Sequence, residues 1–196
     1  MIQDLYIKAK ATAVSRSTAQ LMKSGQTTSY RTGDDGDIEA GRLTSFTTLA
    51  ENNPFGNTNR FTDELGGTTY TKNIVIDWST YNGTNVLGYY RIATVVADWN
   101  AAIDAAAALS IVGYTSGWRL PNKREMENIC NYGTAFILNY APFNLNTVIW
   151  LSTTYLANTA VAYTMSQSWV NLTSKTSAGY RWMACRTFTV TGTTLT

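Results

Sequence analysis

Few side chains in this sequence could carry out catalysis or bind a metal. The 196-residue chain contains no histidine, which excludes Ser-His-Asp and Cys-His catalytic arrangements and removes the commonest zinc ligand. The two cysteines could form one disulfide, but Cys130 falls on the inward side of an expected helix and Cys185 in an expected strand. We therefore predict two buried free thiols.

The carboxylates also give little indication of chemistry. The run Asp34-Asp35-Gly36-Asp37 offers oxygen ligands, but it lacks the spacing and the terminal glutamate of an EF-hand loop. We interpret it as a turn, with an ion site as the alternative. Paired carboxylates can hydrolyse glycosides without histidine, yet no such pair stands beside a recognisable cleft motif. The sequence therefore predicts no catalytic residue, no metal and no cofactor.

The strongest local signal lies in residues 117–125, Gly-Trp-Arg-Leu-Pro-Asn-Lys-Arg-Glu. Pro121 disfavours the helical conformation at Leu120, so the chain reaches Asn122 extended. Asn122 is a suitable N-cap, and Glu125 stands three residues later, as in a capping box. These residues predict a helix that begins at Asn122.

Alanine-rich residues 98–109 predict another helix, with Asp98 as its N-cap. The helix after Asn122 is expected to turn Met126, Ile129 and Cys130 inward and to end near Gly133. Residues 24–72 are rich in Gly, Asn, Asp, Ser and Thr and predict loops with short strands. Strands are expected at residues 5–13, 44–49, 69–73, 74–78, 89–93, 148–152, 160–165, 168–172 and 180–188.

This order predicts an α+β fold with two helices packed on an antiparallel sheet. The length favours one domain, over residues 24–196, preceded by an N-terminal strand or attachment arm at residues 1–23. The last strand could pair with the strand at residues 5–13 and close the domain.

Charge and hydropathy narrow the possible partners. The net charge of +2 and the scattered basic residues do not favour nucleic-acid binding. No segment approaches the roughly 20 apolar residues of a membrane helix, and the N-terminus has no apolar run of signal-peptide length. We therefore expect a protein that lies outside the membrane and does not use a secretory signal.

Several motifs follow one another in an order that resembles a known family. They are the lead-in with Gly25-Gln26, residues 33–41 and residues 60–63, the Asp-Trp helix start at residues 98–99, the run at residues 117–125, the strand Ile-Trp-Leu-Ser-Thr-Thr at residues 149–154, and Tyr-Arg-Trp-Met-Ala-Cys-Arg at residues 180–186. Together they resemble the DUF1566 family, also called Lcl C-terminal-like domains, over roughly residues 24 to 188.

The resemblance implies a C-type-lectin-like fold, an antiparallel sheet flanked by two helices with a long irregular loop region. In that fold Trp118 would be a core anchor, and Arg119 a buried or half-buried donor that needs a carboxylate or carbonyl partner. The motifs of calcium-dependent sugar binding are absent, so we do not expect that activity. Formylglycine-generating enzymes share the broad fold, but Cys130 and Cys185 lie on the wrong elements for their chemistry.

The resemblance also implies a variable binding face, which residues 153–180 would fit. Tyr and Trp give rigid contact area, and Ser and Asn give adaptable hydrogen bonds, although an ordinary polar hairpin surface would have a similar composition. The expected ligand-binding residues are Tyr155, Asn158, Tyr163, Gln167, Trp169, Asn171, Lys175 and Tyr180.

We therefore expect a non-enzymatic phage virion surface or fibre protein that binds a host-surface receptor, either glycan or protein. The alternatives are a structural or decoration virion protein, a bacterial lectin-like adhesin domain and a hydrolase. The expected partners are a host receptor, other virion proteins and further copies of the chain, a trimer being possible.

Overall fold

The fold is built on one large mixed sheet. A computed structural model describes residues 26–32, 45–133, 138, 140–155, 161–166 and 170–196. The strand order is β1-β2-β3-β7-β4-β5-β6, and β8 pairs with the far end of β7. The strands are β1 (Phe61–Thr62), β2 (Ile74–Asp77), β3 (Asn85–Val95), β4 (Ile149–Thr154), β5 (Val161–Met165), β6 (Val170–Ser174), β7 (Arg181–Thr191) and β8 (Thr194–Leu195).

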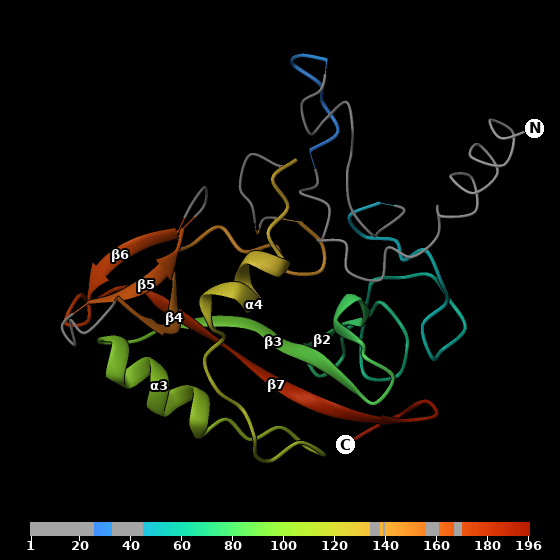
Figure 1. The fold of residues 1–196 in the computed structure, drawn as a ribbon. Coiled ribbons are helices and arrows are strands. Elements are labelled where there is room, and N and C mark those ends of the chain that lie inside the picture. Colours follow the sequence, from blue (N-terminus) through green and yellow to red (C-terminus); the bar gives the residue numbers. More distant parts are fainter. Residues whose placement is uncertain (1–25, 33–44, 134–137, 139, 156–160, 167–169) are drawn as a thin grey trace, which may run out of the picture.

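The long antiparallel pair β3–β7 forms the middle of the sheet, and a helix lies on each face (Figure 1). Alternate residues of β7 point to opposite faces, so Trp182 and Ala184 join one core cluster while Met183 and Cys185 join the other. Helix α3 (Trp99–Ala107) covers the first cluster, and α4 (Lys123–Asn128) contributes to the second. Both faces of the central strands are therefore buried.

The predicted helix starts are confirmed. The Asp98 side chain accepts a hydrogen bond from the Ala101 amide at 2.8 Å and caps α3. Asn122 accepts from the Glu125 amide at 3.0 Å, and Glu125 accepts from the Asn122 amide at 2.8 Å, which completes the capping box. Each cap is satisfied within four residues, and this is why the sequence could predict it.

The end of α4 was predicted wrongly. The helix stops at Asn128 instead of continuing to about Gly133. The Arg60 guanidinium donates to the Asn128 carbonyl at 2.6 Å, so a residue distant in the sequence satisfies one of the last helical carbonyls.

The β-rich C-terminal half agrees with prediction, since β4, β5, β6 and β7 fall near the predicted positions. The strand predicted at residues 89–93 is part of the longer β3. In contrast, residues 69–73 form turns, with positive φ at Tyr70 and Asn73, and residues 45–49 make only isolated bridges. In the first of these segments the Asn73 amide donates to the Tyr70 carbonyl at 2.8 Å, and the Thr69 hydroxyl donates to Asp63 at 3.2 Å.

The expectation of a wholly antiparallel sheet needs correction, because β4 pairs with β7 in parallel through Ile149 and Arg181. The period-two pattern shows which face of a strand is buried but not the direction of the strand, so it could not show this pairing. The α+β description holds in its coarse form, with strands predominant. Residues 1–25, with the expected strand at 5–13, and the carboxylate run at 34–37 lie outside the described residues.

Candidate functional site

The motif at residues 117–125 forms a compact unit against β7. Trp118 is 3% exposed and donates through its indole nitrogen to the Tyr114 carbonyl at 2.8 Å. The next residue, Arg119, exchanges two backbone hydrogen bonds with Cys185 of β7, at 3.0 and 2.8 Å. Leu120 is buried in the same core cluster as Trp118. The motif therefore acts as a short extra strand whose Trp and Leu enter the core.

Arg119 was expected to need a carboxylate or carbonyl partner, and it contacts the Glu125 carboxylate and the Leu120 carbonyl. Its guanidinium is half-exposed and forms a two-pronged ion pair with Glu125, with Nη1 2.7 Å from Oε2. Burial alone would raise the pKa of Glu125, but hydrogen bonds from Arg119 and from the Asn122 amide outweigh it, and the pKa is lowered. The pair fixes the start of α4 against β7.

The two thiols are free and buried, as predicted. Cys185 lies near the Arg119–Glu125 pair, with Sγ 3.1 Å from the Arg119 Nη1. Burial, reinforced by the Glu125 charge, nevertheless raises the pKa of Cys185. Burial likewise raises the pKa of Cys130, to about 12. Because the nucleophile is the thiolate, neither cysteine is activated.

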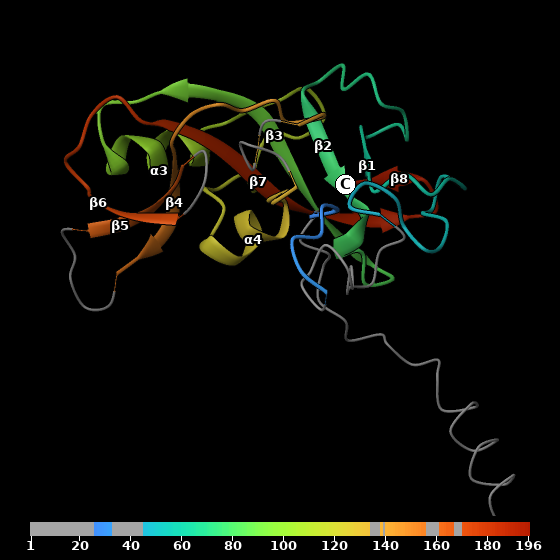
Figure 2. The same cartoon turned by 90° about the horizontal axis from the view of Figure 1, so that it is seen from above.

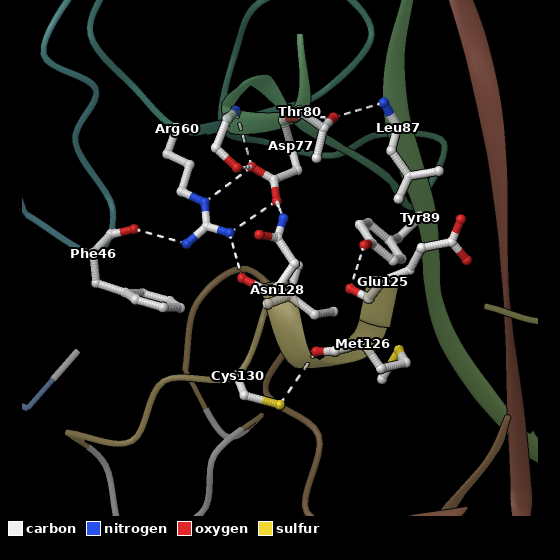
Figure 3. A network of polar contacts seen from close by, with 12 residues as sticks. Phe46, Arg60, Asp77, Thr80, Leu87, Tyr89, Glu125, Met126, Asn128 and Cys130 are labelled. Carbon is white, nitrogen blue, oxygen red and sulfur yellow. Dashed lines mark hydrogen bonds and ion pairs between the residues drawn. The ribbon is translucent and has the colours of Figure 1, made fainter. Parts of the chain in front are cut away.

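A second polar network lies inside the protein (Figure 3). Arg60 and Asp77 are both fully buried, and Arg60 donates through Nε and Nη2 to the two carboxylate oxygens, each at 2.9 Å. Arg60 also donates to the Phe46 carbonyl at 3.1 Å, and its guanidinium lies 4.6 Å from the centre of the Phe46 ring. Burial works against the charged guanidinium, but Asp77 outweighs it, so the pKa of Arg60 is raised.

This network joins the loop before β1, the end of β2 and the end of α4. Asp77 also accepts hydrogen bonds from the Asn128 side chain and from the amide of Ser79. Ser79 belongs to the 3₁₀ helix Trp78–Thr80, which follows β2. All three guanidinium nitrogens of Arg60 and both carboxylate oxygens of Asp77 have protein partners, which supports a structural role. Sequence reasoning missed the pair; the only local signal was an aspartate directly after the apolar run of β2.

The expected ligand-binding residues that the structure describes lie near one edge of the sheet. Strands β4, β5 and β6 lie together at the end of the molecule far from the C terminus (Figure 2). Asn158, Gln167 and Trp169 lie outside the described residues. The other five are placed by the structure, and they divide between the two faces of the sheet.

Tyr155 and Tyr163 are brought together on the α4 side, with ring centres 6.3 Å apart in an edge-to-face arrangement. The Lys123 ammonium lies 5.1 Å from the centre of the Tyr163 ring. Leu172 of β6 stands directly opposite Tyr163 and is 49% exposed. These four residues, Lys123, Tyr155, Tyr163 and Leu172, are called the aromatic patch below.

The remaining three expected residues lie on the α3 side. Asn171 pairs with Thr164, next to the pair formed by Tyr163 and Leu172. Since successive residues of a strand point to opposite faces, Asn171 points away from the aromatic patch. The Lys175 ammonium lies 3.9 Å from the centre of the Trp99 ring. Tyr180 packs edge-to-face on Trp150 at 5.2 Å. Sequence reasoning treated residues 153–180 as one face, but their alternation along β5 and β6 distributes them over two.

Among the described residues, no three His, Cys, Asp or Glu side chains are grouped where they could hold a metal ion. In the same part of the chain, no helix is long and apolar enough to cross a membrane. Comparisons with protein-family models, with curated proteins and with solved structures found no match.

Proposed function

We propose that this chain is a non-enzymatic binding module of a phage virion surface or fibre, which attaches to a receptor on the host cell through the aromatic patch. The observation that carries the proposal is the patch itself. Tyr155 is 38% exposed and Leu172 49% exposed, and both lie next to Tyr163, whose ring the Lys123 ammonium contacts. Exposed tyrosine rings are typical of the anchor residues of binding surfaces.

The ionisable groups of the two networks described above support a binding role more than a catalytic one. Arg60 and Asp77 satisfy each other inside the protein, and Glu125 is held by Arg119 and the Asn122 amide. The virion assignment and the lectin-like form of the fold rest on the resemblance of residues 24 to 188 to DUF1566 domains. The two helices on opposite faces of a β-rich sheet are compatible with it.

Adsorption of particles to host cells tests the proposal. Replacement of Tyr155 by Ala should weaken binding of the patch by about 2 kcal/mol, roughly 30-fold in affinity, if this ring is an anchor. Lys123→Gln tests the cation separately. Tyr30→Ala is the matched control, because Tyr30 is also an exposed tyrosine, at 84%. Unchanged adsorption by correctly folded Tyr155→Ala and Lys123→Gln variants would rule out the patch.

Catalysis is tested separately by incubating the purified chain with host surface polysaccharide and measuring chain length. We expect no shortening. Shortened chains would replace the binding proposal by a hydrolase.

A structural role in assembly is the second candidate, and β6 favours it. Among the described strands β6 lies at one edge of the sheet, and its residues Val170–Ser174 include no charge and no proline. Natural edge strands usually carry charged residues or proline, which prevent pairing with other chains. We propose that β6 contacts another copy of the chain in a homo-oligomer. Leu172→Lys should then lower the oligomeric mass measured by light scattering, and an unchanged mass would contradict this role.

A further inference from the structure

A pocket of about 390 Å³ opens at the other edge of the sheet, beside β1. Its size falls in the range of small-molecule sites. The wall combines rings with small hydroxyl and amide side chains and contains no charged residue. It is formed by Thr47, Thr48, Asn59, Phe61, Thr68, Tyr70, Ala141 and Pro142.

The ring wall is held in place from behind. Arg91 lies 5.3 Å from the centre of the Tyr70 ring and donates to the Pro142 carbonyl at 3.3 Å. The Tyr70 hydroxyl donates to the Phe61 carbonyl at 3.4 Å. Phe61 in turn packs edge-to-face on Phe143 in the core, with ring centres 5.6 Å apart. The rings are therefore positioned before any ligand arrives.

The polar wall has unused hydrogen-bonding capacity. Within the described residues, the side chains of Thr47, Thr48, Asn59 and Thr68 make no hydrogen bond to the protein, although backbone groups of the first three do. Three hydroxyls and one amide supply both donors and acceptors. Burial raises the pKa of Tyr70 to about 12, with a contribution from Asp63, so the lining stays neutral over the physiological range.

We propose that this pocket binds one unit of an uncharged saccharide. A neutral sugar has an apolar C–H face, which suits the partly exposed Tyr70 ring, and hydroxyls that both donate and accept, which suit the Thr and Asn side chains. An acidic sugar would bring a carboxylate or sulfate to a wall without a charged partner, which is unfavourable. This site is separate from the aromatic patch, because β1 and β6 are opposite ends of the strand order.

The test measures binding of the full chain to immobilised neutral oligosaccharides built from hexose, N-acetylhexosamine or 6-deoxyhexose units, and to acidic ones. We expect binding to at least one neutral compound and none to its acidic counterparts. The double variant Thr47→Val/Thr68→Val keeps side-chain shape and removes two hydroxyls. Both residues are exposed, so the fold should tolerate the change. The dissociation constant should rise about tenfold.

Thr94→Val is the matched control, since Thr94 is an exposed threonine of β3 outside the pocket, and it should bind as the unmodified chain does. Absence of binding to every neutral compound would overturn the proposal. So would equal binding of acidic compounds, or binding that the double variant leaves unchanged. Tyr155→Ala separates the two sites, because it should weaken adsorption of particles and leave oligosaccharide binding intact.

Discussion

The buried Arg60–Asp77 pair provides the sharpest test of what holds this fold together. The Asp77 carboxylate accepts two hydrogen bonds from Arg60, further bonds from the amide and hydroxyl of Ser79, and one from Asn128. Replacement of Arg60 by Met fills similar space but removes both charge-assisted bonds. The remaining donors cannot neutralise the carboxylate, which stays buried without a cation.

Breaking a buried pair on one side typically costs about 3–5 kcal/mol. For a chain of this length, each kcal/mol lowers the melting temperature by about 2–4 °C, so Arg60→Met should melt roughly 6–20 °C lower. Chemical denaturation with urea measures the same change as a shift in the midpoint. The loss of unfolding free energy should be many-fold larger than the loss caused by replacing a surface arginine. Arg124 is the control, because its side chain is 88% exposed, and Arg124→Met should change stability by less than about 0.5 kcal/mol.

A double-variant cycle separates the pair from its surroundings. Asp77→Asn should be strongly destabilising alone, but the double variant with Arg60→Met should lose at least about 1 kcal/mol less than the sum of the single losses. Additive losses would show that the two side chains do not interact. A loss below about 1 kcal/mol in Arg60→Met would refute the reasoning that the network joins β2 to α4.

Three further predictions concern acid stability, the thiols and packing. The pKa of Glu125 is lower in the fold than its ordinary value near 4.5, so its contribution is complete above pH 4.5 and is lost as the pH falls through the folded pKa. In urea unfolding, Glu125→Gln should therefore cost stability at pH 7 and much less at pH 3, and an equal cost at both would contradict the ion pair. Cys130 and Cys185 should react with a thiol reagent at pH 8 only after denaturant is added, whereas rapid labelling of the native chain would show an accessible thiolate. A Cβ at Gly88 would lie 2.5 Å from the Phe188 ring, so Gly88→Ala should destabilise by about 1–3 kcal/mol in thermal unfolding, and unchanged stability would mean that the ring has room to move.

The parts of the fold that sequence could predict are those set by neighbours in the chain. The capping box of Asn122 and Glu125 closes over four residues, and Asp98 caps α3 in the same way. The apolar alternation of β7 correctly indicated a strand, because period two is a local property. Residues 69–73 were predicted as a strand but form turns, with positive φ at Tyr70 and Asn73, a conformation that a strand does not contain.

The candidate sites depended more on distant contacts. Tyr155 and Tyr163 were expected to act together, and the hairpin-like return of β5 beside β4 brings their rings into contact. Lys175 was expected on the same face and lies on the opposite one, against Trp99. The alternation of side chains along β5 and β6 predicts that neighbouring residues of each strand lie on opposite faces of the sheet. It does not predict the face on which residues outside the strands, such as Tyr155 and Lys175, lie.

The sequence by itself determined where α3 and α4 begin, which residues of the strands are apolar, and that no histidine chemistry is possible. Only the tertiary structure decided that β4 runs parallel to β7, that Arg60 meets Asp77 and ends α4 at Asn128, and that separate loops enclose the pocket at Tyr70. The reason is physical. Caps and alternation follow from hydrogen bonds and side-chain directions within a few residues, whereas strand direction, buried charge pairs and pockets depend on which distant segments pack together.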